Sequence, residues 1–345
     1  MDWLVDAIPS PDGHYQKLAE QRQVQLTKPP GSLGYLEALA VKLAALQATE
    51  SPVIERVHVS VFAADHGVAE ESVSAFPQQV TREMVKNFAR GGAAVNVLSR
   101  YVNADFEVID CGLKQAVSDK KVINDSAGNG TANFAHRPAM TQLQLEQALN
   151  AGRKAACRAQ KKQADLFVGG EMGIANTTSA TALACALLNV EAADLVGAGT
   201  GLSNRQINHK MAVIEKAIQQ HQKNLISPLD IMQILGGFEI AALTGAYIQS
   251  AQNKIPVLVD GFITTAAALC AIKINAKVKD WLFFSHCSHE QGHQYLLDSI
   301  QARPLLNLDM RLGEASGALV AVPLMQMACR LHNDMATFQE AGITT

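Results

Sequence analysis

The sequence predicts an α/β fold with a doubly wound, mainly parallel sheet, and two observations lead to this prediction. Six short apolar runs each end in glycine or small polar residues, as expected for strands that are buried on both faces of a parallel sheet. Helical stretches such as 141–161 and 204–222 lie between the runs, so strand and helix alternate. The predicted strands are 57–63, 106–109, 165–168, 194–196, 255–259 and 281–284.

Both ends of the chain predict helices outside this alternation. The stretch 316–341 is helix-like, and we expect it to fold back on the N-terminal helices. Pro323 falls about two turns into it and is expected to kink or divide the helix. Near the N-terminus, leucines spaced by three and four residues indicate an amphipathic helix over 32–47: Leu33, Leu36, Leu39, Leu43 and Leu46.

Composition excludes several classes of protein. The chain has 345 residues, 48% apolar and 18% charged, and is too apolar and too weakly charged to be disordered. Lys and Arg total 29 against 32 for Asp and Glu, so no basic excess exists to attract nucleic acid. We expect no membrane partner, because no apolar stretch approaches the length of a spanning helix. Six scattered cysteines and an acidic start favour reduced thiols in a cytoplasmic protein.

Two glycine-rich loops after predicted strands favour a phosphate. Ligands of open parallel sheets lie outside the carboxyl ends of the strands. The first loop offers glycines, hydroxyls and the start of a helix, although an ordinary strand–helix turn is the alternative. The second loop leads to Lys210, which is placed either to neutralise a ligand or to lie in solvent. The candidate residues of the two loops are Gly173, Ile174, Asn176, Thr177, Thr178, Gly199, Thr200 and Gly201.

Residues 289–293 read HEQGH and match the HExxH pattern of zinc hydrolases. On one helix, His289 and His293 would share a face and bind zinc, with Glu290 as general base and Glu314 as a third ligand. A glycine inside the motif weakens such a helix, and the motif follows a strand. We therefore favour loop donors without a metal and keep a zinc hydrolase as the alternative.

Two further segments are candidates for chemistry. Glu314 lies between glycines just ahead of an apolar helix, either as a base in a low-water cleft or as a first-turn acid favoured by the helix dipole. The segment 74–84 suits one wall of a pocket for a flat aromatic ligand, or else an ordinary loop before a core helix. Asp65 and His66 suggest acid–base work, but the sequence shows no partner nucleophile.

Taken together, these motifs resemble the nicotinate-nucleotide–dimethylbenzimidazole phosphoribosyltransferase (CobT) family, in order from about residue 27 to the end. The resemblance implies a Rossmann-like sheet in a catalytic domain over 51–308. It also implies a smaller helical domain, formed from 1–50 and 309–345, and a homodimer. The matching motifs are 28–37 (KPPGSLGYLE), 63–68 (AADHGV), 73–78 (VSAFPQ), 87–98 (NFARGGAAVNVL), 170–174 (GEMGI), 199–202 (GTGL), 259–262 (VDGF) and 311–314 (RLGE).

The family resemblance implies a reaction that needs no cofactor or metal. It transfers the phosphoribosyl group of nicotinate mononucleotide to 5,6-dimethylbenzimidazole and yields α-ribazole 5′-phosphate, the nucleotide of the cobalamin lower ligand. A nucleotide-sensing protein without catalysis is the remaining alternative.

The resemblance also implies roles for individual residues. Glu314 matches the catalytic base, and Glu171 and Lys210 match residues at the nucleotide site. Three alanines depart from the family pattern, which often has Gly, Arg and Gly at 175, 198 and 315. The phosphoribosyl contacts are completed by Ser288 and Gly313, and the expected benzimidazole contacts are Ser74, Phe76, Gln78, Val80, Met84 and Leu312.

Overall fold

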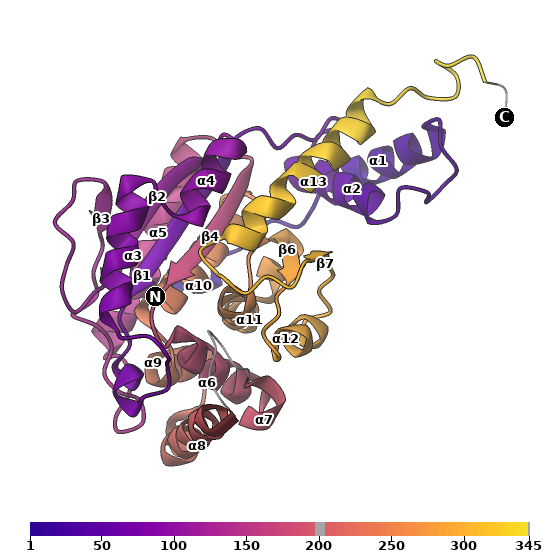
Figure 1. Cartoon of the computed structure of the whole chain (residues 1–345). Coiled ribbons are helices and arrows are strands. Elements are labelled where there is room, and N and C mark those ends of the chain that lie inside the picture. Colours follow the sequence, from indigo (N-terminus) through magenta and orange to yellow (C-terminus); the bar gives the residue numbers. More distant parts are fainter. Residues whose placement is uncertain (197–203, 344–345) are drawn as a thin grey trace.

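A seven-stranded sheet forms the centre of the structure (Figure 1), a computed structural model that describes residues 1–196 and 204–343. The strands lie in the order β3-β2-β1-β4-β5-β6-β7. From β1 to β3 successive strands are added on one side of β1, and from β4 onwards they are added on its other side. Every pairing is parallel, which confirms the predicted fold class. The strands are β1 (Val57–Ala64), β2 (Asp105–Gly112), β3 (Val122–Asn124), β4 (Leu166–Met172), β5 (Val257–Val259), β6 (Leu282–Cys287) and β7 (Pro304–Asn307).

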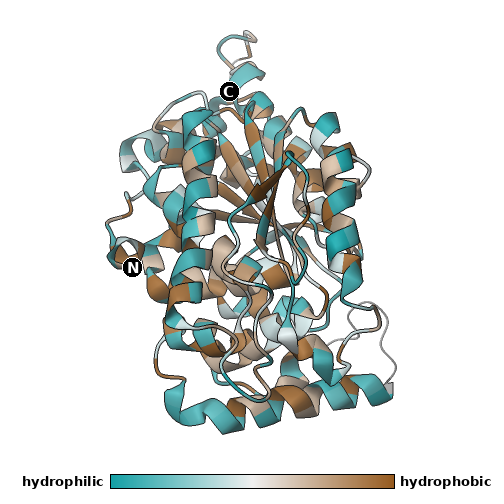
Figure 2. Cartoon of the chain, turned by 90° about the vertical axis from the view of Figure 1, so that its left-hand side faces the viewer, coloured by the Kyte–Doolittle hydropathy of each residue, from teal (hydrophilic) through white to brown (hydrophobic). Residues whose placement is uncertain are grey.

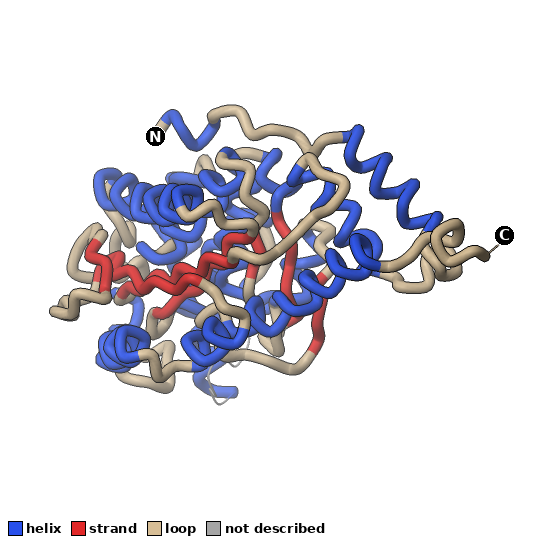
Figure 3. Tube along the Cα trace, turned by 90° about the horizontal axis from the view of Figure 1, so that it is seen from above, coloured by secondary structure: helices blue, strands red, loops and turns tan. Residues whose placement is uncertain are grey.

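Helices cover both faces of the sheet (Figure 3). One layer contains α5, α10 and α11, and the other contains α3, α4 and α13. Helices α6 to α9 lie below the sheet in Figure 1. The α-helices are α1 (Gly13–Gln25), α2 (Tyr35–Gln47), α3 (Gln79–Arg90), α4 (Ala94–Tyr101), α5 (Gln142–Lys161), α6 (Asn176–Leu188), α7 (Ala192–Leu195), α8 (Asn204–His221), α9 (Pro228–Leu235), α10 (Phe238–Gln252), α11 (Phe262–Ile274), α12 (His293–Ser299) and α13 (Ser316–Asp334).

The hydrophobic core lies between these layers, and Figure 2 shows the strands as its apolar centre. Every residue of β1 is buried, which explains why its sequence is almost continuously apolar. In the part of the chain that the structure describes, no helix is long and apolar enough to cross a membrane. All six cysteines carry free thiols, as expected.

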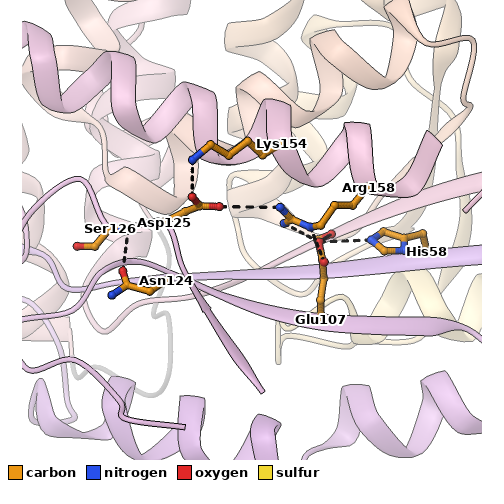
Figure 4. A network of polar contacts seen from close by, with 8 residues as sticks. His58, Glu107, Asn124, Asp125, Ser126, Lys154 and Arg158 are labelled. Atoms are coloured by element: carbon orange, nitrogen blue, oxygen red, sulfur yellow. Dashed lines mark hydrogen bonds and ion pairs between the residues drawn. The ribbon is translucent and has the colours of Figure 1, made fainter. Parts of the chain in front are cut away.

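A polar network ties α5 to the sheet (Figure 4). Glu107 on β2 accepts a hydrogen bond from Arg158 Nε at 2.8 Å and lies 3.3 Å from His58 Nε2. Burial alone would raise the pKa of Glu107, but hydrogen bonds from His58 and Arg158 outweigh it and lower the pKa to about 2. Asp125 extends the network by accepting from Lys154. The network therefore stabilises the packing of α5 against the strands.

Helices α5 and α10 approach so closely that glycine is required at their contact. A Cβ built on Gly152 would lie 1.7 Å from the carbonyl oxygen of Ala242. We expect Gly152→Ala to lower the free energy of unfolding by about 3 kcal/mol, measured by urea denaturation. Gly13→Ala is the control, because a Cβ there meets nothing within 4 Å. Equal denaturation midpoints for the two variants would contradict this account of the packing.

The C-terminal helix folds back on the N-terminal helices, as expected, and α1, α2 and α13 lie together in Figure 1. Arg22 Nε donates to the carbonyl oxygen of His332 at 2.6 Å, and Gln23 Nε2 donates to His332 Nδ1 at 2.8 Å. A main-chain bridge joins Leu26 to Thr337. We propose that 1–50 and 309–345 form a smaller unit beside 51–308, on the basis of these contacts.

Three predictions about elements are wrong. Residues 194–196 do not form a strand, because Asp194 and Leu195 end the short helix α7 and β5 occupies the place beside β4. The strands β3 and β7 are missing from the prediction, since each is short and only partly apolar. Of the two effects expected at Pro323, a kink or a division of the helix, the division is contradicted, because α13 continues through the proline from Ser316 to Asp334. Packing of α13 against α2, α4 and β6 supports the helix on both sides of the proline.

Candidate active site

A cavity of about 250 Å³ lies at the carboxyl ends of β4, β5 and β6, beside the reversal in strand order. Ligands of doubly wound sheets bind at this kind of position. The cavity brings together many of the residues singled out from the sequence: Phe76, Val80, Met84, Glu171, Gly173, Ile174, Asn176, Thr177, Ser288, Leu312, Gly313 and Glu314.

Other candidates do not line the cavity. Gln78 Nε2 donates instead to the carbonyl oxygen of His66 at 2.7 Å, and Ser74 Oγ accepts from the N–H of Phe76. Thr178 is fully buried behind the loop. Gly199, Thr200 and Gly201 lie outside the described residues, as does Ala198.

Sequence reasoning missed part of the wall. Most of the missed residues lie at or just after the carboxyl ends of β4, β5 and β6, so their position at the end of a predicted strand was the signal that could have found them. Arg311 follows β7, which the sequence did not predict. Phe262 and Thr264 begin α11, where their apolar neighbours predict an ordinary core helix. The missed residues are Met172, Gly261, Phe262, Ile263, Thr264, His286 and Arg311, and Glu290 lines the cavity although it was considered only as the base of a zinc site.

Two buried carboxyl groups, those of Glu171 and Glu314, line the cavity and form what we call its acidic floor. Glu314 is 5% exposed, and burial together with the negative charge of Asp260 raises its pKa to about 7. Burial likewise raises the pKa of Glu171 well above its usual range, while the hydrogen bond from Asn176 opposes this rise. Buried acids without a paired cation favour the protonated form. A positively charged ligand would therefore stabilise the ionised form of these groups.

Glu314 is presented by a left-handed turn. Gly313, Glu314 and Ala315 have φ values of +82°, +60° and +64°, and α13 begins at the next residue. A left-handed conformation costs an L-residue about 1–2 kcal/mol, so the surrounding structure must hold this turn. Ala175, which precedes α6, is also left-handed at +74°. Two of the alanines that depart from the family pattern thus occupy conformations that glycine adopts more easily.

The opposite wall is built at the start of α6, and the buried Lys210, which does not itself line the cavity, lies behind Thr177 of this wall. Lys210 on α8 is 1% exposed, and its Nζ donates to Thr177 Oγ1 at 2.9 Å. Burial lowers its pKa to about 8. The interpretation of Lys210 as a solvated surface residue is therefore wrong. Asn176 begins α6 and donates from Nδ2 to Glu171 Oε2, which connects this wall to the acidic floor.

Two exposed apolar side chains border the cavity. Phe76 is 49% exposed and Leu312 is 58% exposed, although each is large and hydrophobic. Val80 and Met84 on α3 continue this apolar wall inward. Exposed apolar surface at a cavity is typical of a site for an apolar or aromatic ligand.

The alternative interpretation of HExxH as a zinc site is wrong, because its residues do not share one helix. Helix α12 begins only at His293, and His289 lies outside it with a side chain that is 60% exposed. His293 is buried, and its Nδ1 accepts from the N–H of Ser288 at 2.8 Å while Nε2 contacts Thr265 Oγ1. Burial lowers the pKa of His293 to about 3. Over residues 1–196 and 204–343, no group of three or more His, Cys, Asp or Glu is placed to hold a metal ion.

His66 is a buried structural residue rather than an exposed acid or base. Its Nδ1 lies 2.8 Å from Ser179 Oγ and its Nε2 lies 2.6 Å from Glu239 Oε1. All three side chains are fully buried, so no substrate reaches them. Because Ser179 is on α6 and Glu239 is on α10, His66 joins the loop after β1 to both helices. The main-chain carbonyl of His66 also accepts from Gln78.

Comparisons with known proteins agree on one family. A family model described as phosphoribosyltransferase matches residues 8–343. Nicotinate-nucleotide–dimethylbenzimidazole phosphoribosyltransferases from Xanthomonas oryzae and Azotobacter vinelandii are 55% and 52% identical over 344 residues. The alignments cover 99% of this chain and 99% and 98% of the relatives. A crystal structure of the Thermus thermophilus enzyme of this name has a TM-score of 0.92 and 42% identity, covering 97% of this chain and 99% of that one.

Proposed function

This chain belongs to the nicotinate-nucleotide–dimethylbenzimidazole phosphoribosyltransferase family, and from that premise we propose that it transfers the 5-phosphoribosyl group of nicotinate mononucleotide to 5,6-dimethylbenzimidazole. The products are α-ribazole 5′-phosphate, the nucleotide of the cobalamin lower ligand, and nicotinate. The observation that carries the proposal is the acidic floor of the cavity, formed by Glu171 and Glu314.

The acidic floor suits a reaction in which positive charge moves. Nicotinate mononucleotide has a cationic pyridinium, which leaves as neutral nicotinate when its bond to C1′ breaks. Positive charge develops on the ribosyl carbon and then on the incoming benzimidazole. Ionised Glu171 and Glu314 would stabilise that charge in a site shielded from water. Because the leaving group departs neutral, this step requires no general acid.

Glu314 is placed to complete the reaction as the base. A ring nitrogen of dimethylbenzimidazole attacks C1′ from the face opposite to nicotinate, so the β configuration inverts to α. The other ring N–H of the attached base becomes acidic, and Glu314 takes that proton. A pKa of about 7 suits this role, because the carboxylate is partly ionised near neutral pH and remains basic enough to accept a proton.

The two remaining walls position the substrates. The start of α6, Thr177 and the ammonium of Lys210 are suited to hold the phosphate of the nucleotide. The apolar wall that includes Phe76 and Leu312 is suited to cover the flat benzimidazole. Holding both substrates fixes the attacking nitrogen against C1′, which is the main source of rate when little acid chemistry is needed. The family resemblance also leads us to propose a cytoplasmic homodimer.

Incubation of the purified protein with both substrates tests this function. We expect equimolar nicotinate and α-ribazole 5′-phosphate, identified by chromatography and mass spectrometry, and full activity after dialysis against a chelator. Omission of dimethylbenzimidazole is the control. Nucleotide binding without release of nicotinate would indicate a sensing protein instead.

A further inference from the structure

We propose that Asp260 is a positioning residue that anchors the strained turn presenting Glu314 to the cavity. The proposal goes beyond the reaction itself, and it rests on the proposed function because it takes Glu314 to be the base. Asp260 lies directly after β5, whereas the loop that carries Glu314 follows β7, with β6 between these two strands. Asp260 does not line the cavity. Its effect on the reaction would therefore pass through Glu314.

The contacts of Asp260 fix the chain just after Glu314. Asp260 is 1% exposed, and its Oδ1 accepts from the N–H of Ala318 at 2.7 Å. The main-chain N–H groups of Ala315 and Gly317 lie close enough to this carboxyl group to oppose the rise in its pKa that burial causes. These three N–H groups belong to the last residue of the left-handed turn and to the first turn of α13. One buried carboxyl group thus holds the main chain immediately after the proposed base.

The other side of the turn is held by close packing. A Cβ built on Gly170 of β4 would lie 2.8 Å from the main-chain nitrogen of Ala315 and 2.9 Å from the carbonyl carbon of Glu314. Glu314 and Ala315 both have positive φ values, a conformation that L-residues leave when nothing restrains them. The turn therefore lies between the main chain of β4 and the carboxyl group of Asp260.

Asp260 also acts on Glu314 through its charge. The titratable or charged groups that border the same cavity are Glu171 on β4, His286 on β6, and Glu290 and Arg311 in the loops. Asp260 does not border the cavity, but its negative charge, together with burial, raises the pKa of Glu314. Removal of that charge should therefore lower the pKa of the base, which an ordinary helix-capping role would not do.

The test is Asp260→Asn, which keeps the shape of the side chain and removes its charge. We expect kcat to fall about tenfold, with the KM for nicotinate mononucleotide within about twofold of wild type, because the base is misplaced while the phosphate site is intact. The acidic limb of the pH–rate profile should move to lower pH. In the background of Asp260→Asn, Ala315→Gly should restore part of kcat, because glycine adopts the left-handed conformation without strain.

Asp110→Asn is the matched control. Asp110 is also a buried acid near the end of a parallel strand, and its Oδ1 accepts from the N–H groups of Gly112 and Leu113, both at 2.9 Å. It does not line the cavity, so kcat and the pH profile should match those of the wild type.

Different outcomes separate this inference from the proposed function. Wild-type kcat and an unmoved pH profile in Asp260→Asn would overturn the inference, as would a parallel loss in Asp110→Asn. If Asp260→Asn does not fold, Gly170→Ala displaces the same turn from the β4 side, and an unchanged kcat in that variant would overturn the inference. An inactive but folded wild-type protein would instead overturn the proposed function.

Discussion

Glu314→Gln is expected to lower kcat by about 10²–10⁴-fold, the range for loss of a general base. Glutamine has nearly the same shape and preserves the packing of the turn, but its amide does not accept the proton from the attached benzimidazole. Binding of nicotinate mononucleotide should change little, because the proposed phosphate site is on the opposite wall, at Thr177 and the lysine behind it, Lys210. Steady-state kinetics with each substrate varied in turn measures both effects.

The pH dependence of the wild type provides an independent check on Glu314. Its pKa is raised to about 7, so Glu314 becomes protonated as the pH falls below 7 and is mostly ionised above pH 7. We expect kcat/KM, which reports the titration of the free enzyme, to decrease about tenfold per pH unit on the acidic side and to level off above pH 7. The Glu314→Gln variant should lack this limb. Glu83→Gln, at an exposed acid on α3, is the control and should retain the wild-type profile. Wild-type kcat in Glu314→Gln would remove Glu314 from the role of base.

Lys210→Met is expected to raise the KM for nicotinate mononucleotide about 100-fold with a much smaller change in kcat. Methionine preserves the packing of a side chain that is 1% exposed, but it removes the ammonium beside Thr177. Loss of a buried charge from a phosphate contact costs about 3 kcal/mol, which corresponds to that change in affinity. Equilibrium binding of the nucleotide and steady-state kinetics test the same expectation.

The titration of Lys210 sharpens this prediction. Because its pKa is lowered to about 8, Lys210 loses its charge as the pH rises above 8, and the wild-type KM for the nucleotide should increase there. In Lys210→Met this increase should disappear. Lys216→Met, at an exposed position of the same helix, should behave as the wild type. A normal nucleotide KM combined with a reduced kcat would assign Lys210 to the chemical step instead.

Local patterns in the sequence determined the fold class. Five of the six predicted strands are present because an apolar run followed by glycine has few other stable arrangements in a parallel sheet. The short strands β3 and β7 lack that pattern, and the run at 194–196 has it only weakly, so tertiary packing decided those three segments. The family was also readable from the sequence, because its motifs keep their order along the chain.

The structure decided which candidate residues meet and what state they adopt. Phe76 and Glu314 line one cavity although 238 positions separate them (314 − 76). Their loops follow β1 and β7, which are not neighbours in the sheet, and they meet because the turn at Glu314 packs against Gly170 of β4. Burial is a property of the whole fold, so neither the raised pKa of Glu314 nor the lowered pKa of Lys210 follows from its neighbours in sequence. For the same reason the HExxH spacing does not by itself indicate a zinc site, since spacing implies a shared face only if one helix contains both histidines, and α12 begins at the second. Sequence therefore determined what is local and ordered along the chain, while distance, burial and strain required the tertiary structure.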